Sequence, residues 1–129
     1  MANVYKNAMF DLTTTNSTVV YTCPTNRTAL IKTIQVTNIH SGANEIEAFT
    51  TDASDSGAVH EISHISLASK TTENLAKGII VLESEDTLKL KAQTADDIAG
   101  IVCVLEIFII RFFLVFIPNN PNLKFAFFS

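Results

Sequence analysis

Residues 29–39 read Ala-Leu-Ile-Lys-Thr-Ile-Gln-Val-Thr-Asn-Ile, and this stretch decides the fold. It is rich in β-branched residues, and apolar and polar side chains alternate along it, as in a strand with one buried face. The apolar positions change phase once, between Ile31 and Ile34. Because successive side chains of a strand point to opposite faces, this change requires a β-bulge or burial on both faces. We therefore predict a strand over Ala29–Ile39 with one of these two features.

Further short apolar stretches surround this strand, separated by polar turns rich in Ser, Asn, Asp and Gly. The predicted strands are Met9–Leu12, Thr18–Cys23, Glu45–Phe49, Gly78–Leu82, Thr87–Ala92 and Ile98–Ile107, while Val59–Leu67 fits either a strand or a helix. Turn signals recur about every 8–12 residues, the spacing of antiparallel sandwiches and barrels. No stretch has a sustained helical period. The predicted fold class is all-β, an antiparallel β-sandwich or jelly-roll-like barrel of about eight strands.

The chain has 129 residues, enough for one domain, and its composition divides it into two parts. Seven of the nine Phe lie in residues 108–129, where the only charged residues are Arg111 and Lys124. All 13 acidic residues and the other seven basic residues lie in residues 1–107, which carry a net charge of −6. We therefore predict a β-sandwich body over 1–107 and an apolar, Phe-rich C-terminal arm over 108–129.

The arm has apolar runs too short for a helix that crosses a membrane. The uninterrupted run from Phe112 to Ile117 has six residues, whereas a spanning helix needs about 20. We expect instead a strand that continues from the body, a Pro-Asn turn at 118–122 and a second short strand. Such an apolar surface would pack on its own body or on a neighbouring subunit. Phe, Ile, Asn and Lys are the residues that A/T-rich DNA mainly encodes, so read-through past an earlier stop near Ile107 is an open alternative for the arm.

Charge and cysteine content indicate the kind of partner and the compartment. A net charge of −4, with the lysines of the body dispersed among acidic residues, argues against binding of nucleic acid. The N-terminus lacks the charged start and apolar run of a signal peptide, so we expect a cytoplasmic origin. In that reducing compartment Cys23 and Cys103, which lack metal-ligand spacing, are expected to stay free thiols.

One motif suggests a catalytic metal. His60-Glu61-Ile62-Ser63-His64 matches the H-E-x-x-H pattern of zinc proteases, which works on a helix because residues i and i+4 share a face. The Ile and Ser residues here are weak helix formers, and a strand would place the two histidines on one face and Glu61 on the other. We expect incidental surface histidines. A surface metal or pH-sensitive contact through His60 and His64 is one alternative, and a zinc hydrolase is a remote one.

Other catalytic and cofactor-binding patterns are missing from the sequence. It contains no G-x-S-x-G, P-loop, G-x-G-x-x-G or EF-hand pattern, and turn chemistry explains the acidic residues of the loops. We therefore predict a protein that is not an enzyme and that uses no cofactor and no resident metal. A carbohydrate-binding module is disfavoured because the body has few aromatic residues.

Six short blocks follow one another along the body. They are Asn3–Ala8, Asp11–Thr15, Val20–Pro24, Thr28–Asn38, Leu82–Lys89 and Val104–Ile107. In this order they resemble small virion structural proteins of marine tailed phages, notably cyanophages. The resemblance covers roughly residues 2–107 and is loosest over 40–77. Members of this group typically end near Ile107, so the Phe-rich arm departs from their pattern.

The resemblance implies a non-enzymatic β-sandwich built into the virion in many copies. The leading interpretation is a capsid decoration or cement protein that stabilises the head by adhesive subunit contacts. By analogy it would be a homo-oligomer, with a trimer as the expected form, and its partners would be the major capsid protein or other virion proteins. The alternative is a tail, neck or fibre component. In either case the protein would be located in the virion, which is assembled in the host cytoplasm.

Two apolar segments are the candidate interface. They are the N-terminal segment Val4–Phe10 and the first part of the arm, Phe108–Phe116. The candidate contact residues are Val4, Tyr5, Phe10, Phe108, Phe112, Phe113 and Phe116. If the arm joins subunits, replacing Phe112 and Phe113 with Asp should abolish assembly while the body stays folded.

Overall fold

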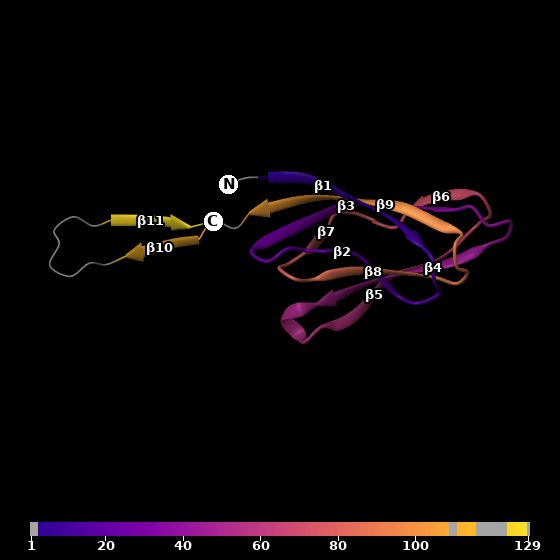
Figure 1. Cartoon of the computed structure of the whole chain (residues 1–129), viewed down its shortest axis with the longest axis horizontal. Coiled ribbons are helices and arrows are strands. Elements are labelled where there is room, and N and C mark those ends of the chain that lie inside the picture. The colour runs from indigo at the N-terminus through magenta and orange to yellow at the C-terminus, as the bar shows by residue number, and fades with distance from the viewer. Residues whose placement is uncertain (1–2, 109–110, 116–123, 129) are drawn as a thin grey trace.

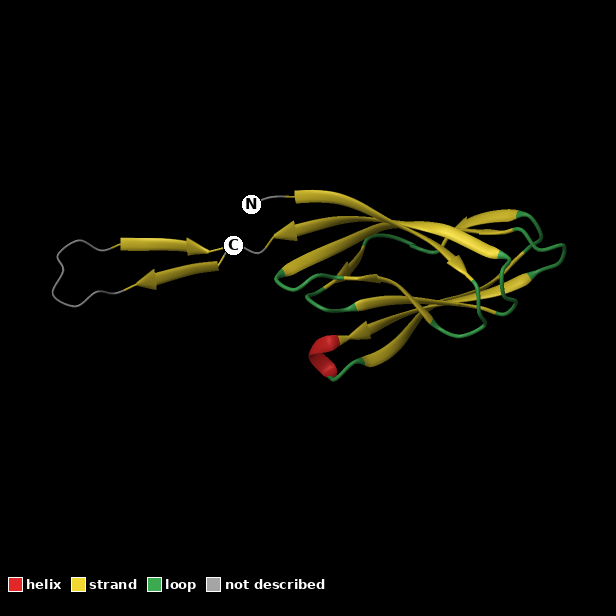
Figure 2. Cartoon of the chain, in the orientation of Figure 1, coloured by secondary structure: helices red, strands yellow, loops and turns green. Residues whose placement is uncertain are grey.

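The computed structural model describes residues 3–108, 111–115 and 124–128, and the body consists of two antiparallel sheets packed face to face (Figure 1). The strands are β1 (Asn3–Leu12), β2 (Thr18–Thr22), β3 (Arg27–Asn38), β4 (Asn44–Asp52), β5 (Ala58–Leu67), β6 (Thr71–Asn74), β7 (Ile80–Leu82), β8 (Thr87–Ala92), β9 (Ile98–Phe108), β10 (Arg111–Val115) and β11 (Lys124–Phe128). Within the described residues the helical structure amounts to one 3-10 turn at Ala53–Asp55 (Figure 2). The all-β prediction is confirmed.

The order of the strands identifies the type of sandwich. Sheet A has the order β1-β9-β3, with β6 and β7 both along the far side of β3, and sheet B has the order β2-β8-β4-β5. The pairs are nested in the sequence: β1 with β9, β2 with β8, β3 with β6 and β7, and β4 with β5. With β6 and β7 counted as one interrupted strand, this is the jelly-roll arrangement of eight strands.

The core lies between the two sheets and follows from the alternation of the strands. In β8 the side chains of Leu88, Leu90 and Ala92 are buried, while Lys89 and Lys91 point outward. The largest fully buried apolar side chains are Leu12, Ile31, Ile34, Val36, Ile46, Leu67, Leu82, Leu88, Leu90, Ile98 and Val102. They come from both sheets, so the apolar faces of the sheets are buried against each other.

The phase change within residues 29–39 is a β-bulge. The register of β3 with β9 shifts between Ile31 and Thr33, so Lys32 is the extra residue. Ile31 before the bulge and Ile34 after it are therefore both fully buried. Of the two predicted features, a β-bulge or burial on both faces, the structure shows the β-bulge.

The structure differs from the predicted strands chiefly at β1 and β6, and it decides the alternative left open for Val59–Leu67. The first strand begins at Asn3, six residues before the predicted Met9, because pairing with β9 continues through polar residues. The Val59–Leu67 stretch is a strand, β5. The short strand β6 was not predicted, because Thr-Thr-Glu-Asn has no apolar side chain to reveal it.

The described part of the arm contains two strands, while the predicted Pro-Asn turn at 118–122 lies outside the described residues. β10 and β11 pair only with each other among the described residues and form a separate two-stranded sheet. Cys23 and Cys103 are both free thiols, the first buried and the second partly exposed on β9. No helix within the described residues has the length and apolar character needed to cross a bilayer.

Candidate functional site

The outer face of sheet A is apolar along β9, which lies between β1 and β3. Val102 and Val104 point into the core, and the residues between and beside them point outward. The outward-facing residues are Ala99, Ile101, Cys103, Leu105 and Ile107, all partly exposed. A strand that is apolar on both faces is normally covered on both faces. The outer face of sheet A is therefore a candidate contact surface.

One row of large apolar side chains crosses this face from edge to edge. Tyr5 on β1 lies opposite Leu105 on β9. Leu105 also lies opposite Leu30 on β3, and Leu30 lies opposite Val81 on β7. Side chains that lie directly opposite on one face are close enough to contact each other. Tyr5 is 73% exposed and Val81 56%, so both ends of this apolar row are open to solvent.

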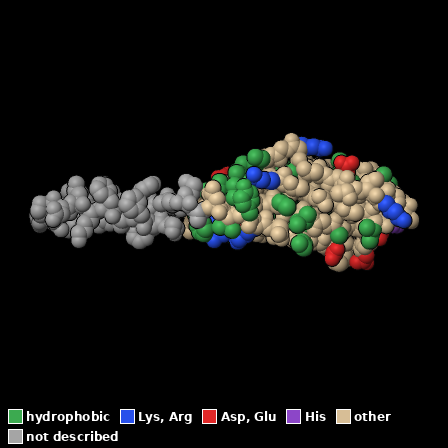
Figure 3. Space-filling model, turned by 90° about the horizontal axis from the view of Figure 1, so that it is seen from above, with side chains coloured by type: hydrophobic (Ala, Val, Ile, Leu, Met, Phe, Trp, Pro, Cys, Tyr) green, Lys and Arg blue, Asp and Glu red, His purple; other side chains and the backbone are tan. Residues whose placement is uncertain are grey.

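The apolar surface extends beyond the row. Met9, which is 77% exposed, lies opposite Ile101 on the same face. Figure 3 views sheet A from outside and shows apolar side chains across the face, with most of the charged side chains near its rim. Large exposed apolar side chains that form a group, surrounded by polar residues, are typical of protein–protein contact surfaces.

A small groove of about 250 Å³ lies in this face beside the apolar row. Its lining includes Tyr5, Lys32 and Cys103. The ammonium group of Lys32, the bulge residue of β3, lies 5.5 Å from the centroid of the Tyr5 ring, a cation–π distance. The groove, which Lys6 also lines, therefore combines two cations, one aromatic ring and one free thiol.

A buried ionic cluster lies at the C-terminal end of β9, on the face that is turned toward the core. The carboxylate of Glu106 is 1% exposed and accepts a hydrogen bond of 2.5 Å from the Tyr21 hydroxyl. Arg27 donates to its other oxygen at 2.6 Å, and the ammonium group of Lys6 lies 3.1 Å from that oxygen. The four residues come from β1, β2, β3 and β9, so this Glu106 cluster connects the two sheets at the end from which the arm leaves.

The electrostatics of the cluster keep Glu106 ionised. Burial alone raises the pKa of this carboxyl, but the hydrogen bonds from Tyr21, Arg27 and Lys6 favour the charged form and leave the pKa below its ordinary value. Burial, followed by the hydrogen bond to Glu106, raises the pKa of Tyr21, which therefore stays protonated. The cluster is fully paired, and its place suggests a structural role at the base of the arm.

The predicted interface residues of β1 are divided between its two faces. Tyr5 points outward and is one end of the apolar row. Phe10 points inward and packs against the core, and Val4, six positions earlier, lies on the same side as Phe10. Met9 is the other exposed apolar residue of the strand, and it was missed because the predicted contacts favoured aromatic side chains.

The predicted contacts of the arm lie partly outside the described residues. Phe108 ends β9, and its ring lies 3.9 Å from the guanidinium carbon of Arg27, so it contacts its own body. Phe112 and Phe113 lie in β10, where the backbone pairing is described but the side chains are not. Phe116 lies outside the described residues.

Leu105, Leu30 and Val81 were not predicted as contact residues. The signal was present in β9, where apolar residues occupy both sets of alternate positions over 101–105. A strand buried on one face only would carry polar residues at every second position. Which neighbours complete the apolar row depends on the strand pairing, which the sequence does not specify.

The His60–His64 segment lies in β5 and is not helical. Its register against β4 shifts at Ile62, because Ser63 lies opposite Ala48 while Glu61 lies opposite Phe49. The helical arrangement on which the zinc-hydrolase alternative depends is therefore absent from this segment. The prediction that Glu61 points away from His64 was wrong, since the bulge brings the Glu61 carboxylate to 3.0 Å from the His64 ring.

The outer face of sheet B has a different character from that of sheet A. A groove of about 760 Å³ is lined by Glu45, Glu47, Lys89 and Lys91, together with Phe49, Val59 and residues of the loop before β2. Acidic side chains of β4 alternate here with basic side chains of β8, and Lys91 lies 3.8 Å from Glu47. The sandwich thus has one apolar and one charged outer face.

Comparisons with known proteins include a weak structural similarity. No family model matches the chain, and no curated protein is similar to it in sequence. A solved structure of Bacillus endospore appendages, described as a novel family of disulfide-linked pili, aligns with a TM-score of 0.46 and 13% identity. The alignment covers 81% of this chain and 85% of that chain. A similarity at this level indicates no shared function.

Proposed function

We propose that this chain is a non-enzymatic structural subunit of a phage virion, a capsid decoration or cement protein. The observation that carries the proposal is the apolar row Tyr5–Leu105–Leu30–Val81 on the outer face of sheet A. An uncovered row of this kind is unfavourable in water and favours association with another protein surface. The resemblance of the body to small virion proteins is the reason for placing that other protein surface in a virion.

The mechanism would be adhesion through repeated weak contacts. Fully burying one Leu or Val side chain contributes about 1.5–3 kcal/mol. The partly exposed row of one copy therefore supports only a modest contact. Many copies on a symmetric shell multiply such contacts, because each subunit is held by several neighbours at once. The partners would be further copies of this chain, in the expected trimer, and the major capsid protein.

The position of the protein in the particle is tested by its copy number. Quantitative mass spectrometry of purified virions, measured against the major shell protein, should give a near-stoichiometric ratio for a decoration protein. A few to a few dozen copies would contradict decoration and support a tail, neck or fibre component. Absence from the particle would overturn the virion proposal as a whole.

The contact surface is tested by a matched pair of substitutions. Val81 on sheet A and Val59 on the opposite face are exposed to nearly the same extent, 56% and 55%. Val81→Asp should prevent the purified chain from forming its oligomer in light-scattering measurements and from entering particles, whereas Val59→Asp should do neither. Equal behaviour of the two variants would exclude the apolar row as the contact surface.

Cys103 provides a test without any substitution. It lies on the outer face of sheet A next to Leu105 and Ile101, where it is partly exposed. A maleimide should modify Cys103 in the isolated subunit and fail to do so in the assembled particle. Modification at the same rate in both states would contradict burial of this face on assembly.

A further inference from the structure

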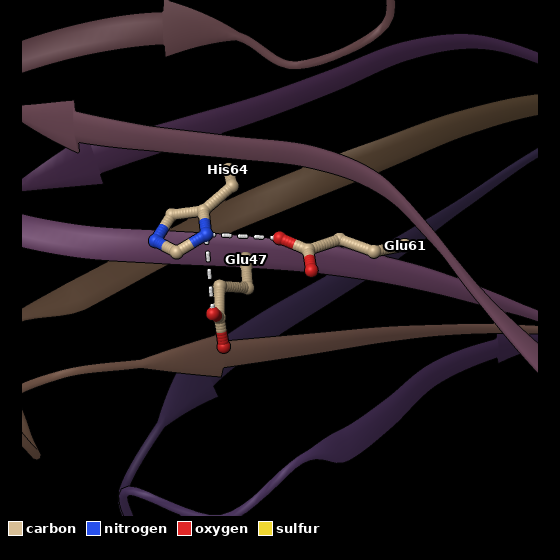
Figure 4. A group of neighbouring side chains, drawn as sticks. All are labelled: Glu47, Glu61 and His64. Atoms are coloured by element: carbon tan, nitrogen blue, oxygen red, sulfur yellow. Dashed lines mark ion pairs between the residues drawn. The ribbon is translucent and has the colours of Figure 1, made fainter.

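Three side chains on the outer face of sheet B converge on one point (Figure 4). His64 on β5 has its Nδ1 atom 3.0 Å from Oε1 of Glu61, on the same strand, and 3.3 Å from Oε1 of Glu47 on β4. One donor atom from each residue lies within 4.8 Å of the other two. We call these three residues the His64 cluster.

The bulge in β5 builds this cluster. In a regular strand Glu61 and His64, three positions apart, would point to opposite faces. The extra residue, Ile62, reverses the alternation and brings Glu61 to the face that His64 occupies. Glu47 is the cross-strand partner of His64 in the register of β4 and β5. The same bulge separates His60 from His64, so His60 is not a member of the cluster.

The surroundings of the ring favour a cation at Nδ1. The Glu45 carboxylate lies 3.9 Å from the other ring nitrogen, Nε2, so a hydrogen on Nε2 points toward a negative charge. With the hydrogen of a neutral ring on Nε2, the lone pair of Nδ1 faces the carboxylates of Glu47 and Glu61. Two carboxylates and a lone pair repel one another unless a cation lies among them.

The charge of the surroundings also favours a divalent ion. Lys91 lies 3.8 Å from Oε2 of Glu47, whereas His64 faces the other oxygen, Oε1. With a neutral imidazole, the carboxylates of Glu45, Glu47 and Glu61 exceed the one ammonium group in ionic contact with them, that of Lys91, by two negative charges. Lys89 lines the same groove of sheet B. A proton on Nδ1 would supply one positive charge and would align well with only one of the two carboxylates.

We propose that the His64 cluster binds one Zn²⁺ ion through Nδ1 of His64 and one carboxylate oxygen each of Glu47 and Glu61. Nitrogen and oxygen ligands of zinc lie about 2.0–2.2 Å from the ion, which places tetrahedral ligands roughly 3.3 Å apart. The separations of 3.0 and 3.3 Å already approach this geometry. Three protein ligands leave the fourth position to water. The ion would fasten β5, an edge strand of sheet B, to β4, and this proposal is independent of the virion function.

Calorimetric titration of the full chain with ZnCl₂ at neutral pH tests the site. We expect one Zn²⁺ per chain, and a rise in the thermal unfolding midpoint that is reversed by a chelator. His64→Ala and Glu61→Gln should each weaken binding at least about 10-fold. His60→Ala is the matched control, because it removes the other imidazole of the same strand, and it should change the affinity less than about twofold.

Nitrogen NMR of the histidine side chains gives a readout that does not depend on the variants. On addition of Zn²⁺ the Nδ1 resonance of His64 should shift more than its Nε2 resonance, and the His60 resonances should stay in place. No binding, or binding that His60→Ala weakens as much as His64→Ala does, would overturn the proposal. Folding of each variant is checked by its circular dichroism before titration, so loss of binding is separated from loss of structure.

Discussion

Tyr21 on β2 and Glu106 on β9 belong to different sheets, and the hydroxyl of the first donates a 2.5 Å hydrogen bond to the buried carboxylate of the second. The two residues are 85 positions apart in the sequence. Arg27 and Lys6 bring two cations to the same carboxylate from the neighbouring strands. The body is therefore joined at this end by a paired buried charge in addition to its apolar core.

Glu106→Gln should destabilise the body by about 3 kcal/mol, because it removes a buried anion and leaves the partly buried Arg27 without its partner, while Lys6 is exposed to solvent. Urea unfolding at neutral pH, followed by circular dichroism, measures the change. Tyr21→Phe removes one hydrogen bond and keeps both ion pairs, so it should cost less, about 1.5–2 kcal/mol. A Glu106→Gln variant as stable as the natural chain would show that the cluster contributes nothing.

The stability should also fall in acid through Glu106. Its pKa is lowered in the folded state, so its contribution is complete above the unfolded-state pKa of about 4.3 and is lost as the pH falls toward and through the folded-state pKa. Urea midpoints measured from pH 6 to pH 2.5 should therefore decrease more steeply for the natural chain than for Glu106→Gln. Parallel curves would mean that other carboxylates cause the whole decrease.

Gly100→Ala should be strongly destabilising. Gly100 lies on β9 opposite Phe10, and an added Cβ atom would lie 2.0 Å from the Gln35 carbonyl oxygen and 2.8 Å from the Phe10 ring. Backbone of β3 cannot move away without breaking the ladder, so we expect a loss of about 3 kcal/mol or failure to fold. Gly42→Ala is the control, since its nearest neighbour is a His40 ring atom at 3.6 Å, and its urea midpoint should be almost unchanged.

The two cysteines should differ in reactivity in the folded, isolated chain. Cys23 is fully buried, and burial raises the pKa of its thiol, whereas Cys103 is partly exposed on the outer face of sheet A. Iodoacetamide at neutral pH should label Cys103 first and Cys23 only after denaturation, as peptide mass spectrometry would show. Equal labelling of both thiols in the native chain would contradict the packing of Cys23 at the start of the β2–β3 loop.

Local sequence patterns predicted those parts of the fold that depend on local alternation. The phase of Ile31 and Ile34 predicted either a bulge or burial on both faces of β3, and the bulge is present. The bulge in β5 at Ile62 was not predicted, since Ile62 and Ile65 give no clear phase in a segment so rich in Ser and His. Without this bulge, the predicted strand placed Glu61 on the face opposite His64. The His64 cluster was therefore not predicted.

The candidate contact surface depended on information of a different kind. That Tyr5 is exposed follows from Asn3 and Asn7, the polar residues two positions before and after it on the same face of the strand. That Tyr5, Leu30 and Val81 form one row with Leu105 follows only from the register of four strands that are distant in the sequence. Registers of non-local pairs are set by the packing of the whole sandwich, so no single segment encodes them.

The nested pairing also determines how the molecule would respond to force. Asn3 lies opposite Ile107 and Leu12 lies opposite Ile98, so β1 begins beside the point where β9 ends and where the arm departs (Figure 1). A pull between the N-terminus and the arm would peel β1 from β9 one hydrogen-bonded pair at a time, a weaker geometry than shearing the whole strand at once. Val4 and Glu106 form the second pair to open. The ion pairs of Glu106 with Lys6 and Arg27 would therefore resist the separation of β1 from β9 near its start.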